Sequence, residues 1–271
     1  AHNPSLGKID PFLVAQYALL EACARTVSVG AVPIAITDCL CFGNPEKPEQ
    51  MWQFAQSCLS IQEACDQLRF SDLNNLPIVA GNVSFYNQSG NKAVPASPVI
   101  GCFGKTTKKS LLNNNFQHKN SVIYHVGSQH SMLGGSLVCK IVGVENTKIG
   151  KIDVSKYSDT LNTLLEANAL SLLESCSYSG LGGLAATVSK MCFKNSIGCL
   201  VKPIKKELLF SENLSFIVEV KQQNSLRFQQ VLEKNNVSFN KIGATNNANK
   251  IIFDGYIDIE VCSTKSIWKN S

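Results

Sequence analysis

The sequence predicts an α+β fold of two domains, an N-terminal α/β sheet domain over residues 1–132 and a C-terminal α+β domain over residues 133–271. Its 271 residues are 44% apolar, which is enough to build two cores of ordinary size. Helical and strand patterns are mixed without strict βαβ alternation, and this favours α+β over a doubly wound sheet. The polar, glycine-containing segment 128–135 marks the expected boundary.

The N-terminal domain is expected to begin with a helix that runs to Ser28, because Asp10 suits the N-cap and Pro11 the first helical position. A second helix is predicted from Pro48. Its apolar residues recur at helical spacing, so Trp52 is expected in the core. Strands are predicted over residues 31–42, 76–85, 97–104 and 121–126, the second and third being paired through a turn at 87–91.

The C-terminal domain should contain both kinds of element. A glycine-rich turn over residues 179–183 is expected to open a helix that ends at Phe193. Other helices are predicted over residues 154–176 and 225–234, strands near Cys199 and Phe216, and a closing hairpin over residues 251–259.

Charge and hydropathy exclude several classes of protein. The net charge is +5 and basic residues are interleaved with acidic ones, so no nucleic-acid partner is indicated, and the lysines of segment 105–109 are read as a solvated loop. No apolar run reaches the ~18 residues of a membrane-spanning helix. With no signal peptide either, the expected location is cytoplasmic. The sequence begins at Ala1 rather than Met, so we expect it to belong to a longer polypeptide.

The eleven cysteines lack paired C-x-x-C spacing, which argues against a disulfide framework and against a zinc site. They are interpreted as reduced hydrophobic residues. Cys39 and Cys41 are the closest pair and should face the same side of a strand.

Asp38 is the first candidate site residue, because an apolar strand leads into it and Gly43 opens a turn soon afterwards. An unpaired carboxylate is rare in a buried strand. Asp38 is therefore expected either to cap amides at the exit of the strand or to face a ligand in a polar site.

The segment Gly81-Asn82-Val83-Ser84 is the second candidate, because glycine inside a strand often marks close approach by a ligand. Gly81 would admit a phosphate or nucleotide edge. The side-chain carbonyl of Asn82 is a suitable Mg²⁺ ligand, and the Ser84 hydroxyl should lie on the same face. The alternative is a bulge before a hairpin. We expect Asp38 and Asn82 at adjacent strand ends with their oxygens facing one pocket.

These segments also resemble a known family. The runs TDCLCFGNPEKP (37–48), MWQF (51–54) and GNVSFYN (81–87) are similar to phosphoribosylformylglycinamidine synthases of purine biosynthesis. Shorter matches extend the resemblance over essentially the whole chain: KIDP (8–11), PVIG (98–101), LGGS (133–136), GGLA (182–185) and LFSE (209–212).

The resemblance implies one of two tandem modules of the aminoimidazole ribonucleotide synthetase type. The first module of the family carries a Gly-His-Asn-His motif with the catalytic histidine and most acidic Mg²⁺ ligands. The present sequence resembles the second module only, and His2 is interpreted as the eroded counterpart of that motif. No catalytic residue is therefore assigned, and the chain is expected to be inactive alone.

The family reaction is the ATP-dependent amidation of formylglycinamide ribonucleotide with ammonia from glutamine. Carried over residue by residue, the resemblance implies that Asp38 and Gly81 contact ATP, that Asn82 binds Mg²⁺, and that Ser84 contacts the substrate. The implied cofactors are ATP and Mg²⁺. The implied partners are the first module and a glutaminase domain or subunit.

Two positions depart from the family pattern. Cys41 stands where asparagine is usual, and the turn at 179–183 lacks the usual Asp of Ser-Asp-Gly-Gly, so Gly182 and Gly183 are read chiefly as packing residues. His118, His125 and His130 receive no function.

Two alternatives remain open: a non-catalytic structural or assembly module of the synthase, and a related aminoimidazole ribonucleotide, selenophosphate or thiamin-phosphate enzyme. The strands around Ile34, Ile78 and Ile100 are expected to present an apolar face. With no partner module to cover that face, the chain is predicted to form a two-fold homodimer, sheet against sheet.

Overall fold

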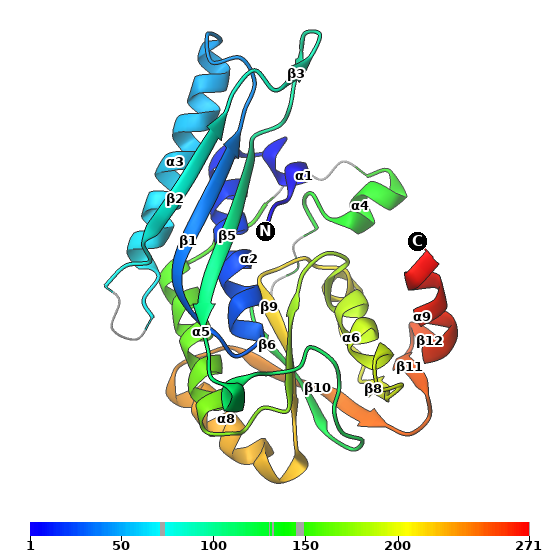
Figure 1. The fold of residues 1–271 in the computed structure, drawn as a ribbon. Helices are drawn as coiled ribbons and strands as arrows, with labels where there is room; N and C mark the ends of the chain where they lie inside the picture. Colours follow the sequence, from blue (N-terminus) through cyan, green and yellow to red (C-terminus); the bar gives the residue numbers. More distant parts are fainter. Residues whose placement is uncertain (71–73, 130, 132, 145–148, 271) are drawn as a thin grey trace. The chain divides into compact units, whose positions relative to one another are not determined.

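A computed structural model of the chain describes residues 1–70, 74–129, 131, 133–144 and 149–270 (Figure 1). They form two compact units. Unit 1 comprises Ala1–Val27, Val32–Lys105 and Leu133–Ser158, and unit 2 comprises Ser28–Ala31, Thr106–Met132 and Asp159–Ser271. The chain passes between the units several times, whereas the sequence suggested one boundary between residues 132 and 133.

The interleaving has two physical causes. Strand β6 (Val122–Gly127) was expected in the N-terminal sheet, but it pairs with two strands of unit 2, β9 (Ser215–Val220) and β10 (Phe239–Asn246). Conversely, the start of α5 (Val154–Ala169) belongs to unit 1, where the Ser158 hydroxyl accepts a hydrogen bond of 3.0 Å from the backbone of Arg69.

The described strands of unit 1 include a three-stranded sheet in the order β2-β1-β5. Its central strand, β1 (Val32–Cys41), pairs in parallel with β2 (Ile78–Ser84) and antiparallel with β5 (Ser97–Lys105). The predicted pairing of the strands at 76–85 and 97–104, which correspond to β2 and β5, is therefore wrong, because β1 lies between them. The turn itself is confirmed, since β3 (Gln88–Ser89) and β4 (Lys92–Ala93) form a small hairpin there.

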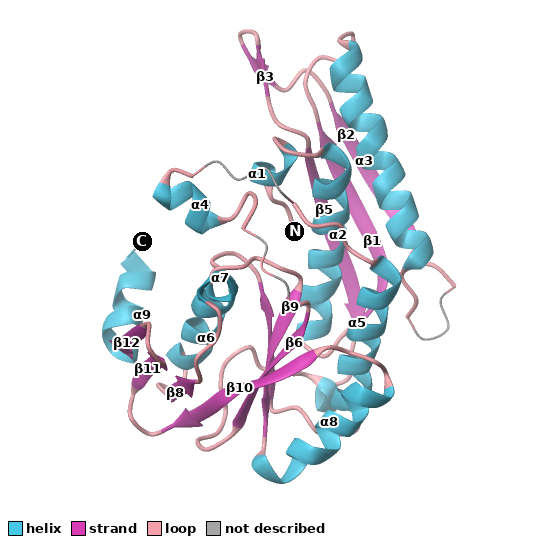
Figure 2. Cartoon of the chain, turned by 180° about the vertical axis from the view of Figure 1, so that it is seen from behind, coloured by secondary structure: helices cyan, strands magenta, loops and turns pink. Residues whose placement is uncertain are grey.

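Two long helices, α2 (Pro11–Ser28) and α3 (Pro48–Gln67), lie on the same face of this sheet, as the opposite views of Figures 1 and 2 agree. The Asp10 carboxylate accepts hydrogen bonds of 2.9 Å from the amides of Phe12 and Leu13, which confirms the predicted N-cap. No helix among the described residues is long and apolar enough to cross a membrane. The short helices α1 (Pro4–Gly7) and α4 (Leu137–Val142) complete the unit.

The expectation that Trp52 lies in the core is wrong, because its side chain is 56% exposed. Phe54 instead provides the aromatic contact of α3. Its ring meets Phe42 and Phe85 edge-on, with centroids 5.5 Å and 5.3 Å away. Helical spacing predicts that the helix has an apolar face, but it does not determine which residue of that face points into the core.

Unit 2 contains, within the described part of the chain, a seven-stranded sheet in the order β12-β11-β8-β10-β6-β9-β7. Its remaining strands are β7 (Ser175–Ser179), β8 (Gly198–Val201), β11 (Lys250–Phe253) and β12 (Ile257–Glu260). Its described helical segments are the larger part of α5, from Asp159 on, together with η1 (Lys108–Ser110), α6 (Gly183–Phe193), α7 (Lys206–Leu209), η2 (Gln222–Asn224), α8 (Ser225–Lys234) and α9 (Val261–Asn270).

Helices pack on both faces of this sheet because successive strand residues point to opposite sides. Ile123 of β6 belongs to the apolar core cluster that also contains Val188 and Met191 of α6. Its neighbour Tyr124 instead meets Phe228 of α8, with ring centroids 5.1 Å apart. Both faces of β6 are buried, so the sheet forms the middle layer of unit 2.

The predictions for unit 2 succeed where local signals are strong. Helix α8 spans the predicted residues, and α6 begins at the glycine-rich turn and ends at Phe193. The helix predicted over 154–176 ends early at Ala169, because Ser171 adopts a left-handed φ of 56° and the chain then enters β7. Strand β10 and helix α9 were not predicted.

Candidate functional site

The candidate residues of β1 and β2 lie side by side. In the parallel register Asp38 pairs with Gly81, Cys39 with Asn82, and Cys41 with Ser84. The expected adjacency of Asp38 and Asn82 is therefore confirmed. Asp38 and Gly81 lie inside their strands rather than at the strand ends, so Asp38 does not cap the exit of β1.

The Asp38 side chain points to the face covered by α3. Its neighbours along that face, Ile36 and Leu40, are buried, and its charge helps to raise the pKa values of the α3 thiols Cys58 and Cys65. For both thiols burial is the larger cause. Asp38 thus occupies a polar position within an otherwise apolar strand face.

Gly81 makes room for this carboxylate. A Cβ atom at Gly81 would lie 2.9 Å and 3.1 Å from the two carboxylate oxygens of Asp38, closer than ordinary van der Waals contact. The glycine inside the strand is thereby explained by close approach of a side chain from the neighbouring strand. Gly81 itself remains exposed to solvent.

Burial raises the pKa of Asp38, and a hydrogen bond from the Asn82 backbone partly offsets this effect. Among the described residues no lysine or arginine forms an ion pair with Asp38. The carboxylate is therefore half-buried and uncompensated by a cation of unit 1. This is the electrostatic state that favours a cation or a proton donor supplied by a ligand.

The side chains of Asn82 and Ser84 leave the opposite face of the sheet. The Nδ2 atom of Asn82 lies 3.4 Å from Cys39 Sγ, on the face that does not carry Asp38. The expectation that the oxygens of Asp38 and Asn82 face one pocket is therefore wrong, because a paired register places residues 38 and 82 on alternate faces. Asn82 and Ser84 share a face, as expected.

Local hydrogen bonds hold Ser84 in place. The Asn87 side chain donates bonds of 2.8 Å to the carbonyl oxygen of Ser84 and 3.1 Å to that of Phe42. Its Nδ2 also lies 3.1 Å from the Ser84 hydroxyl. Asn87 thus ties the end of β2 to the end of β1, and the Ser84 hydroxyl is oriented by a neighbour three residues away.

The cysteines of this face behave as expected. Cys39 and Cys41 place their sulfur atoms 3.8 Å apart on one side of β1. All eleven cysteines of the chain lie in its described part and carry free thiols. Cys41, where the related family has asparagine, is only partly exposed, and burial raises the pKa of its thiol.

The glycine-rich turn before α6 supports its interpretation as a packing element. A Cβ atom at Gly183 would lie 2.6–2.9 Å from backbone atoms of residues 209–211. The Glu212 carboxylate accepts a hydrogen bond of 3.0 Å from the Gly182 amide. A side chain of the protein thus already occupies the positive end of this helix.

None of the three described histidines sits in a cluster suited to chemistry. His118 pairs with Glu174 at 2.7 Å on the surface, and burial lowers the pKa of His125 to about 4. The ring of His2 lies 3.2 Å from the Pro98 carbonyl oxygen. His130 lies outside the described residues. Within the described part of the chain, no three His, Cys, Asp or Glu side chains gather into a metal-binding group.

The apolar face predicted for the sheet is present only in part. Ile34 and Ile78 are 43% and 46% exposed, but Ile100 is buried on the helix-covered face. Val99 and Phe103, which alternate with Ile100 along β5, are exposed instead. The outer face of the sheet therefore carries Val99 and Phe103 on β5 and Asn82 and Ser84 on β2, with β1 between them.

Comparisons with known proteins agree with this fold. A family model described as AIR synthase related protein, N-terminal domain, matches residues 1–106. The phosphoribosylformylglycinamidine synthase subunit PurL of Campylobacter lari is 33% identical over 271 residues. These matches identify the chain as a PurL-type module. The match covers 98% of the chain but 36% of the relative, so the module spans about a third of the length of the curated protein it resembles.

Solved PurL structures share the α+β fold of this PurL-type module. T. maritima PurL complexed with FGAR superimposes with a TM-score of 0.77 at 15% identity, covering 97% of this chain and 44% of that one. The same protein complexed with ATP gives a TM-score of 0.74 at 16% identity, covering 97% of this chain and 42% of that one. At this level of identity the likeness establishes the fold alone.

A second group of polar residues was missed by the sequence reasoning. Four lysines gather in unit 2, Lys190 and Lys194 at the end of α6 and Lys265 and Lys269 on α9. The available signal was the spacing of four residues within each pair, which places both members on one helical face. It was overlooked because α9 was not predicted as a helix.

Proposed function

We propose that this PurL-type module supplies one wall of the active site of a phosphoribosylformylglycinamidine synthase. That ligase converts formylglycinamide ribonucleotide, glutamine and ATP into formylglycinamidine ribonucleotide in purine biosynthesis. The observation that carries the proposal is the 33% identity to a PurL subunit over 98% of the chain. The solved complexes of T. maritima PurL with ATP and with FGAR support the choice of ligands.

The proposed contacts follow from the two faces of β2. This strand lies at the edge of the described sheet, and Gly81, beside the Asp38 carboxylate, is exposed. ATP that approaches there meets Asp38 on one face. On the other face, the Asn82 carbonyl oxygen binds Mg²⁺ and the Ser84 hydroxyl contacts the ribonucleotide substrate. A ligand that straddles the edge of the sheet can thus use all four residues.

Other parts of the synthase would complete this site. Phosphoryl transfer requires metal ligands and a positioned base, which we assign to the first module of the synthase. A glutaminase domain or subunit supplies ammonia. The eleven free thiols suit a reducing compartment, so the proposed location is the cytoplasm. On its own, the 271-residue chain is expected to form no amidine product.

A non-catalytic assembly role is the second candidate, and the bonds around Ser84 favour it. The Asn87 side chain already engages the hydroxyl and carbonyl of Ser84. If that network only joins β1 to β2, removing the Ser84 hydroxyl would affect folding rather than catalysis. The two candidates therefore differ in a measurable way.

The test uses a complete synthase that contains this module. Asn82→Ala and Ser84→Ala should each lower synthase activity by about tenfold or more, with an unchanged melting temperature. Ser89→Ala, on the exposed hairpin strand β3, is the matched control and should leave activity unaltered. Loss of stability in step with loss of activity would support the assembly role instead. The isolated 271-residue chain should hydrolyse no ATP; turnover that Asn82→Ala abolishes would contradict the shared-site proposal.

A further inference from the structure

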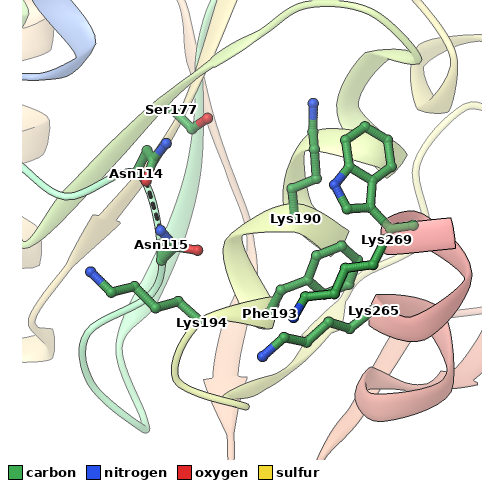
Figure 3. Close-up of a pocket in the computed structure, with 9 residues that line it drawn as sticks. Asn114, Asn115, Ser177, Lys190, Phe193, Lys194, Lys265 and Lys269 are labelled. Carbon is green, nitrogen blue, oxygen red and sulfur yellow. Dashed lines mark hydrogen bonds between the residues drawn. The ribbon is translucent and has the colours of Figure 1, made fainter. Parts of the chain in front are cut away.

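A cavity of ≈ 510 Å³ lies in unit 2 between the loop that joins η1 to β6, strand β7 and the helices α6 and α9 (Figure 3). It is lined by the four lysines Lys190, Lys194, Lys265 and Lys269 together with Asn114, Asn115, Ser177, Phe193 and Trp268. Its volume falls within the range of roughly 300–1,000 Å³ that is typical of small-molecule sites.

The cavity concentrates positive charge. Its lining holds four lysines, and none of its nine described lining residues is acidic, although the net charge of the whole chain is only +5. Within the described part of the chain, Lys194, Lys265 and Lys269 form no ion pair. Like charges four residues apart on a helix repel each other, so both lysine pairs would be stabilised by a bound anion.

Figure 3 shows that Lys265 and Lys269 extend from α9 in the same direction, past Phe193. Their ammonium groups therefore lie on one side of the cavity. Asn114, Asn115 and Ser177 contribute amide and hydroxyl groups opposite to α9 (Figure 3). Ammonium, amide and hydroxyl groups together provide several hydrogen-bond donors for the oxygens of a phosphate chain.

An aromatic ring adjoins these cations. Trp268 lines the cavity while remaining 55% exposed, and Lys190 Nζ lies 5.3 Å from the centroid of its ring. The cation over the ring contributes a cation–π contact that favours this position of the indole. An exposed indole beside a group of lysines is a platform on which a planar base can stack.

We propose that this cavity binds a nucleoside polyphosphate, with its phosphates on the lysines of α6 and α9 and its base against Trp268. The site shares no residue with the candidate site of β1 and β2. It also differs from the glycine-rich turn, which opens α6, because Lys190 and Lys194 lie at the other end of that helix. The ligand would therefore act as an effector, independently of the proposed ligase reaction.

Trp268 provides a local reporter. The chain contains two tryptophans, so Trp52→Phe leaves Trp268 as the only one. ATP titrated into this variant of the full chain should change Trp268 fluorescence saturably. Adenosine and inorganic tripolyphosphate, which carry one half of the ligand each, should bind at least about tenfold more weakly, since each loses one set of contacts.

Charge-matched variants test the lysines. Lys265→Gln with Lys269→Gln should weaken ATP binding by about tenfold or more, because two charged contacts to phosphate are lost. Lys202→Gln with Lys241→Gln removes the same charge from exposed positions of unit 2 outside the cavity and should leave the affinity within about twofold. Asp38→Asn, in the other candidate site, should not alter the Trp268 response. Circular dichroism checks that each variant is folded, and the single variant Lys265→Gln should give an intermediate loss.

Three results would overturn the proposal. The first is no Trp268 response to millimolar ATP. The second is equal weakening by the two double variants, which would indicate a diffuse charge effect. The third is a ligand that binds more tightly than ATP. Tighter binding of tripolyphosphate would assign the cavity to phosphate alone, and tighter binding of an oligothymidine would assign it to a nucleic-acid strand.

Discussion

At the scale of single residues, the unit 1 site depends on the contact between Asp38 and Gly81. The carboxylate fits only because the neighbouring strand offers no Cβ atom. Sequence reasoning identified both residues and their adjacency, because strands that follow each other in α/β patterns are often neighbours. It could not assign their faces, since the face of Asn82 relative to Asp38 depends on a register that only the folded sheet defines.

His125 gives a residue-scale prediction about pH. Its ring is 3% exposed, and burial lowers its pKa from 6.5 to about 4. A histidine with a lowered pKa stabilises the fold above the unfolded-state pKa, and this stability is lost as the pH falls from 6.5 towards 4. The free energy of unfolding should fall by roughly 3 kcal/mol over this range, because each unit of pKa difference between the folded and unfolded states corresponds to about 1.36 kcal/mol.

Urea unfolding of the wild type and of His125→Gln between pH 7 and pH 4 measures this effect. The free energy of unfolding should fall more steeply with decreasing pH in the wild type than in the variant, whatever the stability of the variant at pH 7. Parallel pH profiles would mean that the His125 ring is protonated as readily in the folded chain as in the unfolded one.

At the scale of elements, strong local signals predicted the structure well. The Asp10-Pro11 start of α2 and the extent of α8 agree with the sequence, because capping and helical periodicity act within a few residues. Strand β10 was missed because Asn240, Lys241 and Gly243 interrupt its apolar pattern. The order β2-β1-β5 could not be predicted, since a local turn after β2 suggested pairing with the next strand instead.

The turn before α6 gives an element-scale prediction. Gly183 and Gly143 both have a φ of 69°, but only a Cβ atom at Gly183 would collide with neighbouring backbone. Gly143→Ala should cost about 1–2 kcal/mol for the left-handed conformation alone. Gly183→Ala should cost more by a further ~1–3 kcal/mol, because residues 209–211 cannot move aside without repacking.

Thermal and urea unfolding of the two variants give this difference directly. Equal destabilisation would show that the segment 209–211 yields readily to an added methyl group. The turn would then have room for a ligand, and the interpretation of Gly183 as a packing residue would fail.

At the scale of the whole molecule, the sequence predicts two domains with one boundary, whereas each of the two compact units of the structure is made of three separate segments. Segments 28–31 and 106–132 cluster with unit 2, and 133–158 with unit 1. A linear reading of composition finds linkers, and it cannot detect a strand such as β6 that pairs with partners about a hundred residues later in the chain.

The exposed face of the unit 1 sheet leads to a prediction about assembly. Val99 and Phe103 are exposed there, and apolar surface of this kind favours self-association. The 271-residue chain should sediment as a dimer at micromolar concentration. Phe103→Asp should shift it to monomer, whereas Leu226→Asp, at an exposed leucine of α8 in unit 2, should not. A wild-type chain that remains monomeric at these concentrations would contradict the predicted homodimer.

The parallel pairing of β1 and β2 also sets the order in which unit 1 can assemble. Parallel neighbours cannot be joined by a tight turn, so α3 must fold back across the sheet before β2 can bond to β1. The antiparallel strand β5 comes later in the chain and meets the other edge of β1. During synthesis from the N-terminus, a nascent chain can therefore bring Asp38 against Gly81 while β5 is still inside the ribosome.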